Sequence, residues 1–161
     1  MKILWAPWRS AYVSQAEKIE ECIFCQKITG NDEENYVLLR GNTCFVVLNI
    51  YPYNNGHLMI APYRHIGSLQ ELTKEERAEM MDLSAVCMDA LKEGLNCHGF
   101  NLGINIGKVA GAGVPDHIHI HIVPRWEGDT NFMPVVGDTK VIPQSLSTTY
   151  KILRSMLAEK K

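Results

Sequence analysis

The sequence has no hydrophobic run long enough to cross a membrane, since its longest apolar stretches fall far short of the roughly 20 residues that a spanning helix needs. Its first residues also lack the basic, apolar and small-residue pattern of a secretory signal. No charge of one sign dominates, because the formal net charge is −2, and this excludes a general attraction to nucleic acid or to acidic membranes. We expect a cytoplasmic protein that binds neither, with any phosphate binding confined to a local site.

Internal repeats, low-complexity tracts and long linkers are absent as well. The 161 residues therefore predict one domain over 1–161, which at this length buries roughly 70% of its unfolded surface without disulfides. The five cysteines are an odd set, and Cys44 and Cys87 lie in apolar patterns. Both are expected to be free thiols in the core.

The order of predicted elements indicates an α+β domain with one antiparallel sheet. Thr73 and Glu76 form a capping box at the start of the main helix, about 73–95. A C-terminal helix should follow Pro143, and a short polar helix is expected near 11–20. The strands are predicted in runs of alternating or β-branched residues: 43–50, 57–62, 100–106 and 117–123.

The most informative feature is a set of three histidines at alternate positions, His117, His119 and His121. In an extended strand, alternate side chains share a face and lie roughly 6.7 Å apart. The isoleucines between them would then point to the opposite face, where branched side chains suit a core. The strand is expected to form one wall of a site.

Three explanations of this pattern remain open: buried imidazoles with satisfied hydrogen bonds, metal chelation by all three rings, and nucleophilic catalysis. Chelation would require the strand to bend, and only Asp116 is near enough in sequence to orient the rings. The preceding loop contains Gly107, Gly111 and Gly113, whose backbone N–H groups could approach phosphate oxygens. This favours nucleophilic attack at phosphorus, although a flexible hairpin loop would contain the same glycines.

The run from His117 to Val123 resembles the H-φ-H-φ-H-φ-φ motif of the histidine triad (HIT) superfamily of nucleotidyl hydrolases and transferases. The resemblance covers most of the chain, through further positions in the family's order and approximate spacing: Cys22 and Cys25, Asn49, His57, Thr73 and Asn105. It implies the HIT fold, an adenine nucleotide as substrate, and a homodimer whose sheet continues across the interface.

The resemblance also implies roles for individual residues. His119 would be the nucleophile that takes a nucleoside monophosphate as a covalent adduct, supported by His121 and His57. No catalytic cofactor is required by that chemistry. The positions implied for substrate binding are Asn49, Ile50, Asn105, Gly111, Ala112, Gly113 and Val114.

One departure from the hydrolase branches of the superfamily lies just before the triad. Residues 110–116 lack the usual glutamine and contain one extra residue. With the aromatic start at 4–9 and the residues after the triad, this resembles the branch that includes bacterial diadenosine tetraphosphate phosphorylases, in which inorganic phosphate cleaves the adduct. Ala112, Gly113 and Trp126 are expected to form the phosphate pocket. The alternatives are a nucleoside phosphoramidate or adenylate hydrolase, and a non-catalytic nucleotide-binding interaction protein.

Cys22 and Cys25 form a C-x-x-C pair, which in a reducing compartment is more often a metal or redox pair than a disulfide. With His65 and His117 they match positions that bind zinc in some members of the superfamily. Two thiolates and two imidazoles would make a closed, structural zinc site. The alternative is a reduced pair with His65 at the surface.

Overall fold

A five-stranded antiparallel sheet forms the centre of the computed structural model, which describes residues 22–130 and 141–160. The expectations for 4–9 and 11–20 lie outside the described residues. The strands lie in the order β1-β2-β3-β5-β4, and each neighbouring pair is antiparallel. Their bounds are β1 Val37–Arg40, β2 Cys44–Leu48, β3 Leu58–Pro62, β4 Gly99–Ile104 and β5 Ile120–Arg125. The predicted α+β fold with an antiparallel sheet is confirmed.

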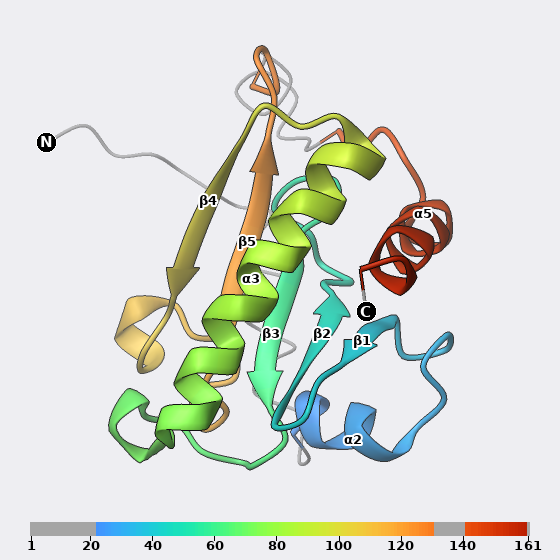
Figure 1. Cartoon of the computed structure of the whole chain (residues 1–161). Helices are drawn as coiled ribbons and strands as arrows, with labels where there is room; N and C mark the ends of the chain where they lie inside the picture. Colours follow the sequence, from blue (N-terminus) through green and yellow to red (C-terminus); the bar gives the residue numbers. More distant parts are fainter. Residues whose placement is uncertain (1–21, 131–140, 161) are drawn as a thin grey trace, which may run out of the picture.

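Helices lie on both faces of this sheet. The longest, α3 (Lys74–Leu95), runs across one face, and α5 (Leu146–Ala158) lies beside it near β1 (Figure 1). The short α2 (Ile23–Thr29) packs on the other face through Phe24. Two 3₁₀ turns complete the described elements, η1 (Leu69–Glu71) and η2 (Lys108–Ala110). Among the described residues no helix is long and apolar enough to span a membrane.

The main core lies between the sheet and α3, on what we call the α3 face of the sheet. Ile118, Ile120 and Ile122 are buried there with Met80 and Leu91 of α3. The predicted separation of isoleucines from histidines is thereby confirmed. Cys44 and Cys87 are buried free thiols, as expected.

The boundaries of α3 follow from local hydrogen bonding. The hydroxyl of Thr73 accepts from the backbone N–H of Glu76 at 3.1 Å, and the Thr73 N–H donates to the Glu76 carboxylate at 2.8 Å. Asn96 ends the helix in the left-handed conformation. The predicted helix at about 73–95 is confirmed.

The opposite face of the sheet holds the histidines, and we call it the histidine face. A smaller cluster covers part of it, including Phe24, Phe45, Val47 and Met59. The predicted strand 117–123 is wrong at its start, because β5 begins only at Ile120. A turn at 115–116 precedes His117, and the first long-range backbone bond of this segment runs from Ile118 N–H to the Ile66 carbonyl at 2.7 Å.

Candidate active site

Three imidazoles meet on the histidine face of the sheet. His57 directly precedes β3, His119 directly precedes β5, and His121 lies within β5 opposite Met59 of β3. The ring centroids of His57 and His121 lie 5.1 Å apart, and those of His119 and His121 lie 4.7 Å apart. His57 and His119 are almost fully buried, while His121 is half-buried. The predicted catalytic histidines are therefore brought together.

The turn before β3 fixes the position of His57. Gly56 has a φ of 74°, and a Cβ atom at this position would lie 2.5 Å from Cδ1 of Leu95. Glycine is the residue that adopts this conformation without strain and leaves room for the side chain from α3. The chain can then pass directly from the turn into β3 with the His57 ring on the histidine face.

Hydrogen bonds assign the proton on each ring of the His57–His121 pair. Nδ1 of His57 accepts from the backbone N–H of Tyr53 at 3.1 Å, with the Asn49 side-chain nitrogen at 3.3 Å. A neutral imidazole has one donor and one acceptor, so Nε2 of His57 carries the proton. It donates to Nδ1 of His121 at 2.9 Å. The proton of a neutral His121 then sits on its Nε2.

His119 is oriented by the backbone two residues earlier. Its Nδ1 lies 2.8 Å from the carbonyl oxygen of His117 and donates to it, because that oxygen can only accept. The lone pair of the ring is therefore on Nε2. The Phe24 ring packs against the imidazole, with the two ring centroids 4.7 Å apart, and restricts rotation of the His119 ring. A buried, single-tautomer imidazole of this kind is suited to act as a nucleophile.

Burial also sets the charge of these rings. It lowers the pKa of His57 to about 3, with smaller effects from the neighbouring His121 and His119. Burial lowers the pKa of His119 too, opposed by its hydrogen bond to the His117 carbonyl. Both rings are neutral near pH 7, which keeps the lone pair of His119 available.

The residues predicted to bind substrate lie at two places around the histidines. Asn49 is buried after β2, and its side-chain oxygen accepts from Tyr51 N–H at 2.9 Å. Ile50 beside it is 44% exposed, as a surface that contacts a ligand requires. Ile104 is the register partner of Ile120 in the antiparallel pair of β4 and β5. Continuing this register by one residue places Asn105 opposite His119.

The loop of residues 107–114 leads into the triad. The N–H groups of Gly111 and Ala112 donate within the loop, to the carbonyls of Lys108 and Gly107 at 3.0 and 3.3 Å. These two donors are therefore engaged in holding the loop. Gly113 and Val114 follow them, and Val114 packs against the cluster around Phe24.

The structure does not bring Trp126 to this loop. Trp126 follows the far end of β5, where its side chain packs on the core of the α3 face and its indole N–H donates to the Leu95 carbonyl at 3.2 Å. Ala112 and Gly113 precede the other end of the same strand. The expected grouping of Trp126 with these two residues is wrong, because successive strand residues alternate between the faces and Trp126 falls on the face of Ile122.

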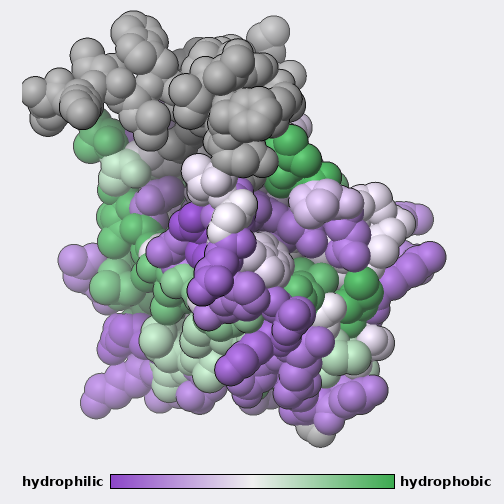
Figure 2. Space-filling model, turned by 90° about the horizontal axis from the view of Figure 1, so that it is seen from above, coloured by the Kyte–Doolittle hydropathy of each residue, from purple (hydrophilic) through white to green (hydrophobic). Residues whose placement is uncertain are grey.

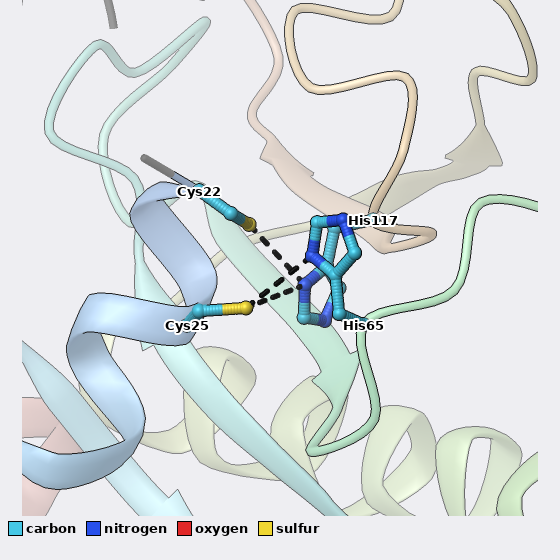
Figure 3. Close-up of side chains that lie close together, drawn as sticks. All are labelled: Cys22, Cys25, His65 and His117. Carbon is cyan, nitrogen blue, oxygen red and sulfur yellow. Dashed lines mark hydrogen bonds between the residues drawn. The ribbon is translucent and has the colours of Figure 1, made fainter. Parts of the chain in front are cut away.

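The four residues of the predicted metal set come together at one end of the sheet. Cys22 and Cys25 lie at the start of α2 and point toward the rings of His65 and His117 (Figure 3). All four ligand atoms lie within 4.8 Å of one another. Sγ of Cys22 is 3.3 Å from Nδ1 of His117, and Sγ of Cys25 is 3.3 Å from Nδ1 of His65. Around a tetrahedral zinc ion, with bonds of about 2.0–2.3 Å, ligand atoms lie about 3.3–3.8 Å apart, so the set fits zinc.

The second nitrogen of His117 supports this fit. Nε2 lies 2.9 Å from the Pro62 carbonyl and donates to it. The lone pair is therefore on Nδ1, the atom that faces both sulfurs. An outer hydrogen bond that fixes the tautomer in this way is typical of a metal-ligating histidine.

Comparison with known proteins agrees with this geometry. A family model described as the HIT domain matches residues 31–128. The chain belongs to the HIT family. It is 41% identical over 158 residues to the AP-4-A phosphorylase of Mycobacterium tuberculosis, a match that covers 93% of this chain and 81% of that protein. The family prediction is confirmed.

Two further relatives extend the comparison. The bis(5'-adenosyl)-triphosphatase of Dictyostelium discoideum is 34% identical over 85 residues, which cover 53% of this chain and 56% of that protein. The crystal structure of a Zn-bound histidine triad family protein from Mycobacterium smegmatis matches with a TM-score of 0.72 and 29% identity, covering 87% of this chain and 95% of that one. With enzymes among these HIT relatives, the prediction of a HIT-family enzyme is confirmed.

Two residues of the site were missed by sequence analysis. Phe24 packs on His119, and the backbone of Tyr53 orients His57. The position of Phe24 inside the C-x-x-C pair was a usable signal, because a metal site that includes His117 brings α2 close to His119. The role of Tyr53 rests on a backbone N–H group, which any residue but proline would supply.

Proposed function

We propose that this chain cleaves dinucleoside polyphosphates such as diadenosine tetraphosphate, by transfer of the nucleotidyl group through His119 to inorganic phosphate. The observation that carries the proposal is the bond from Nδ1 of His119 to the His117 carbonyl, because it leaves Nε2 as a nucleophile on a neutral, buried ring. The 41% identity to an AP-4-A phosphorylase supports the choice of substrate.

In the first step, Nε2 of His119 attacks the innermost phosphorus of the bound nucleotide. A phosphorus–nitrogen bond forms, and the bond from phosphorus to the bridging oxygen breaks. The polyphosphate departs as an anion with the electrons of that bond, and its leaving oxygen accepts a hydrogen bond from Nε2–H of His121, whose Nδ1 accepts from His57. Asn49 and Ile50 would hold the nucleoside, and Asn105 would contact the phosphate beside His119.

In the second step, an oxygen of inorganic phosphate attacks the same phosphorus. The phosphorus–nitrogen bond breaks, His119 leaves as the neutral imidazole with its lone pair restored, and His121 keeps its proton because the attacking phosphate oxygen is already deprotonated. Backbone donors that surround the phosphoryl oxygens stabilise the charge that develops in both steps. Gly113 and Val114 are the residues we assign to this role, since the N–H groups of Gly111 and Ala112 are engaged within their own loop.

The products distinguish this reaction from hydrolysis. Incubation with diadenosine tetraphosphate and inorganic phosphate should give ADP and ATP, at a rate that rises with phosphate. AMP and ATP, formed equally fast without phosphate, would instead assign a hydrolase. Binding of the substrate without any product would assign the nucleotide-binding interaction protein.

A structural zinc ion would complete the fold around this site. The donor set Cys22, Cys25, His65 and His117 fits it, and when bound the ion would supply a tetrahedral link between α2 and the segment that leads to the triad. His117 has both nitrogens committed in this arrangement, one to the metal and one to the Pro62 carbonyl. The attack on phosphorus and the hydrogen bond to the leaving group therefore belong to the other histidines.

We also propose a homodimer that forms along β4. The edge at β1 is covered, because the hydroxyl of Tyr150 and the guanidinium of Arg154, both on α5, donate to the carbonyls of Val37 and Leu38. The edge at β4 carries the exposed apolar side chain of Leu102 instead, at 43% exposure, and Ile106 just beyond the strand is 48% exposed. Figure 2 shows hydrophobic surface along the side of the molecule where β4 lies. Pairing of two such edges would extend the sheet and cover these side chains.

A further inference from the structure

A cavity of about 330 Å³ opens on the histidine face beside the catalytic histidines. It is lined by Tyr53, Asn54, Asn101, Val123 and Arg125. Tyr53 also orients His57 through its backbone N–H, and the other four residues have no part in the catalytic, nucleoside or zinc positions described above. Along β5 the line of alternate side chains continues from His121 through Val123 to Arg125, so the cavity begins roughly 7 Å beyond His121 and extends roughly 7 Å further.

The two strands that form the floor of this cavity place their side chains side by side. Asn101 of β4 is the register partner of Val123 of β5, and Gly103 is the partner of His121. The lack of a side chain at Gly103 leaves the floor open between His121 and Asn101. The Tyr53 ring joins the two regions, since it stacks on His121 with centroids 5.7 Å apart and planes at 27°. The cavity and the histidines thus share one continuous surface.

The charge in this cavity is already neutralised. The guanidinium of Arg125 donates to both carboxylate oxygens of Asp129, at 2.6 and 2.8 Å, and to the side-chain oxygen of Asn101 at 2.8 Å. The side-chain nitrogen of Asn54 donates to the same carboxylate and to the Pro124 carbonyl. A terminal phosphate would find no unpaired cation among these residues, so an anion is not the ligand that this cavity favours.

The groups that line this cavity are flat, apolar or hydrogen-bonding. Tyr53 as a whole residue is 44% exposed, two hydrogen bonds to Asp129 orient the Arg125 guanidinium, and Val123 supplies an apolar floor. Planar heterocycles stack on tyrosine rings and on guanidinium planes. The side-chain nitrogen of Asn101 offers a donor to ring nitrogens or carbonyls. These properties match a nucleoside.

We infer that this cavity binds the distal nucleoside of the substrate, the one that leaves with the polyphosphate. The inference rests on the proposed function, because it assumes that the other nucleotide is held at His119. A polyphosphate bridge would run from His119 past His121 and over Gly103, so that the second base stacks at Tyr53 and Arg125. A long bridge reaches the cavity, whereas a short one ends before it.

The test compares substrates that share one adenylate and differ in the leaving group. Asn101→Leu removes the donor, and Val123→Phe fills the cavity, while Asn42→Leu is the matched control in the exposed β1–β2 turn. For diadenosine tetraphosphate with inorganic phosphate, kcat/KM should fall roughly tenfold or more in the two cavity variants, the effect of losing one stacked and hydrogen-bonded base. For adenosine 5'-phosphosulfate and for diadenosine diphosphate, kcat/KM should stay within about twofold of the wild type, because neither leaving group reaches the cavity.

Equal losses on all three substrates, or no loss on the tetraphosphate, would overturn the inference. Thermal unfolding of each variant identifies a folding defect, and a defect in one variant leaves the other to decide. A wild-type protein that turns over none of these substrates would refute the proposed function instead. Turnover of all three with insensitive variants would refute the distal site alone.

Discussion

The tautomer of each histidine decides what it can do in this site. His119 donates through Nδ1 to a carbonyl and keeps its lone pair on Nε2, while His57 donates a hydrogen bond through Nε2–H to Nδ1 of His121. A histidine that lost its backbone partner could present either nitrogen, and only one would be productive. The catalytic difference between these similar side chains therefore comes from the backbone atoms that they contact.

Replacement of the proposed nucleophile should abolish turnover without abolishing binding. His119→Asn keeps a polar side chain but has no ring nitrogen that can bond to phosphorus, so we expect kcat to fall by about 10⁴-fold or more. Calorimetric titration with diadenosine tetraphosphate should still detect binding. His98→Asn is the matched control, since His98 is exposed near the end of α3 and should tolerate the change. Substantial turnover by His119→Asn would contradict the assignment.

The buried His57 makes stability depend on pH. Its pKa is about 3 in the folded state and 6.5 in the unfolded chain, so only the unfolded chain gains the proton between these values. Above pH 6.5 this group leaves the free energy of unfolding unchanged. As the pH falls from 6.5 toward 3, protonation of His57 in the unfolded chain lowers the free energy of unfolding. Urea unfolding over this range should show a loss in the wild type that exceeds the loss in His57→Gln by roughly 3 to 4 kcal/mol. If the free energy of unfolding fell equally with pH in the two proteins, His57 would not be the source of the pH dependence.

Trp126 shows how far single residues could be placed from the sequence. The alternation that put His117, His119 and His121 on one face also puts Trp126 on the other, with Ile120 and Ile122. The sequence therefore contained the information that separates Trp126 from the phosphate loop. The partners of His117 and His57 were not accessible in this way, because they are the Pro62 carbonyl and the Tyr53 N–H. Every residue has a backbone carbonyl, and every residue but proline has an N–H, so these partners leave no mark on composition or spacing.

Among the elements, α3 and α5 were predicted from the sequence, whereas α2 and β1 were not. α3 carries its own start signal in Thr73 and Glu76 and its own end at Asn96, so local chemistry sets both boundaries. The start of β5, in contrast, is set by pairing with a distant strand and not by the local sequence. The pattern of alternation runs from His117, but ladder pairing begins at Ile120, opposite Ile60 of β3. His117 is displaced from the ladder and lies beside α2 and the two cysteines.

Zinc at this junction should stabilise the contact between α2 and the triad segment. Elemental analysis of the purified protein should find stoichiometric zinc, which Cys22→Ser loses because a serine hydroxyl is a poor replacement for a thiolate ligand. A strong chelator should lower the unfolding temperature of the wild type toward that of Cys22→Ser. Cys97→Ser is the control, since Cys97 is buried away from the cluster and its loss should leave the zinc content unchanged. Wild-type protein without zinc, purified in the absence of chelators, would contradict the assignment.

For the whole molecule, the two edges of the sheet differ in the way that a dimer along β4 requires. Leu102→Lys places a charge in the middle of the exposed β4 surface and should convert the dimer into a monomer. Sedimentation velocity would measure the change. Leu69→Lys is the control, because Leu69 is similarly exposed at 41% but lies in η1. A wild-type protein that sediments as a monomer would exclude the β4 dimer.

The covalent intermediate at His119 is the step on which the proposed chemistry depends. The protein would be incubated with diadenosine tetraphosphate in the absence of phosphate, denatured at alkaline pH to preserve a phosphorus–nitrogen bond, and digested for tandem mass spectrometry. We predict an adenylyl group on His119, which disappears with formation of ADP when phosphate is added before denaturation. Turnover that proceeds with no adduct, or with the adduct on a different residue, would contradict the account.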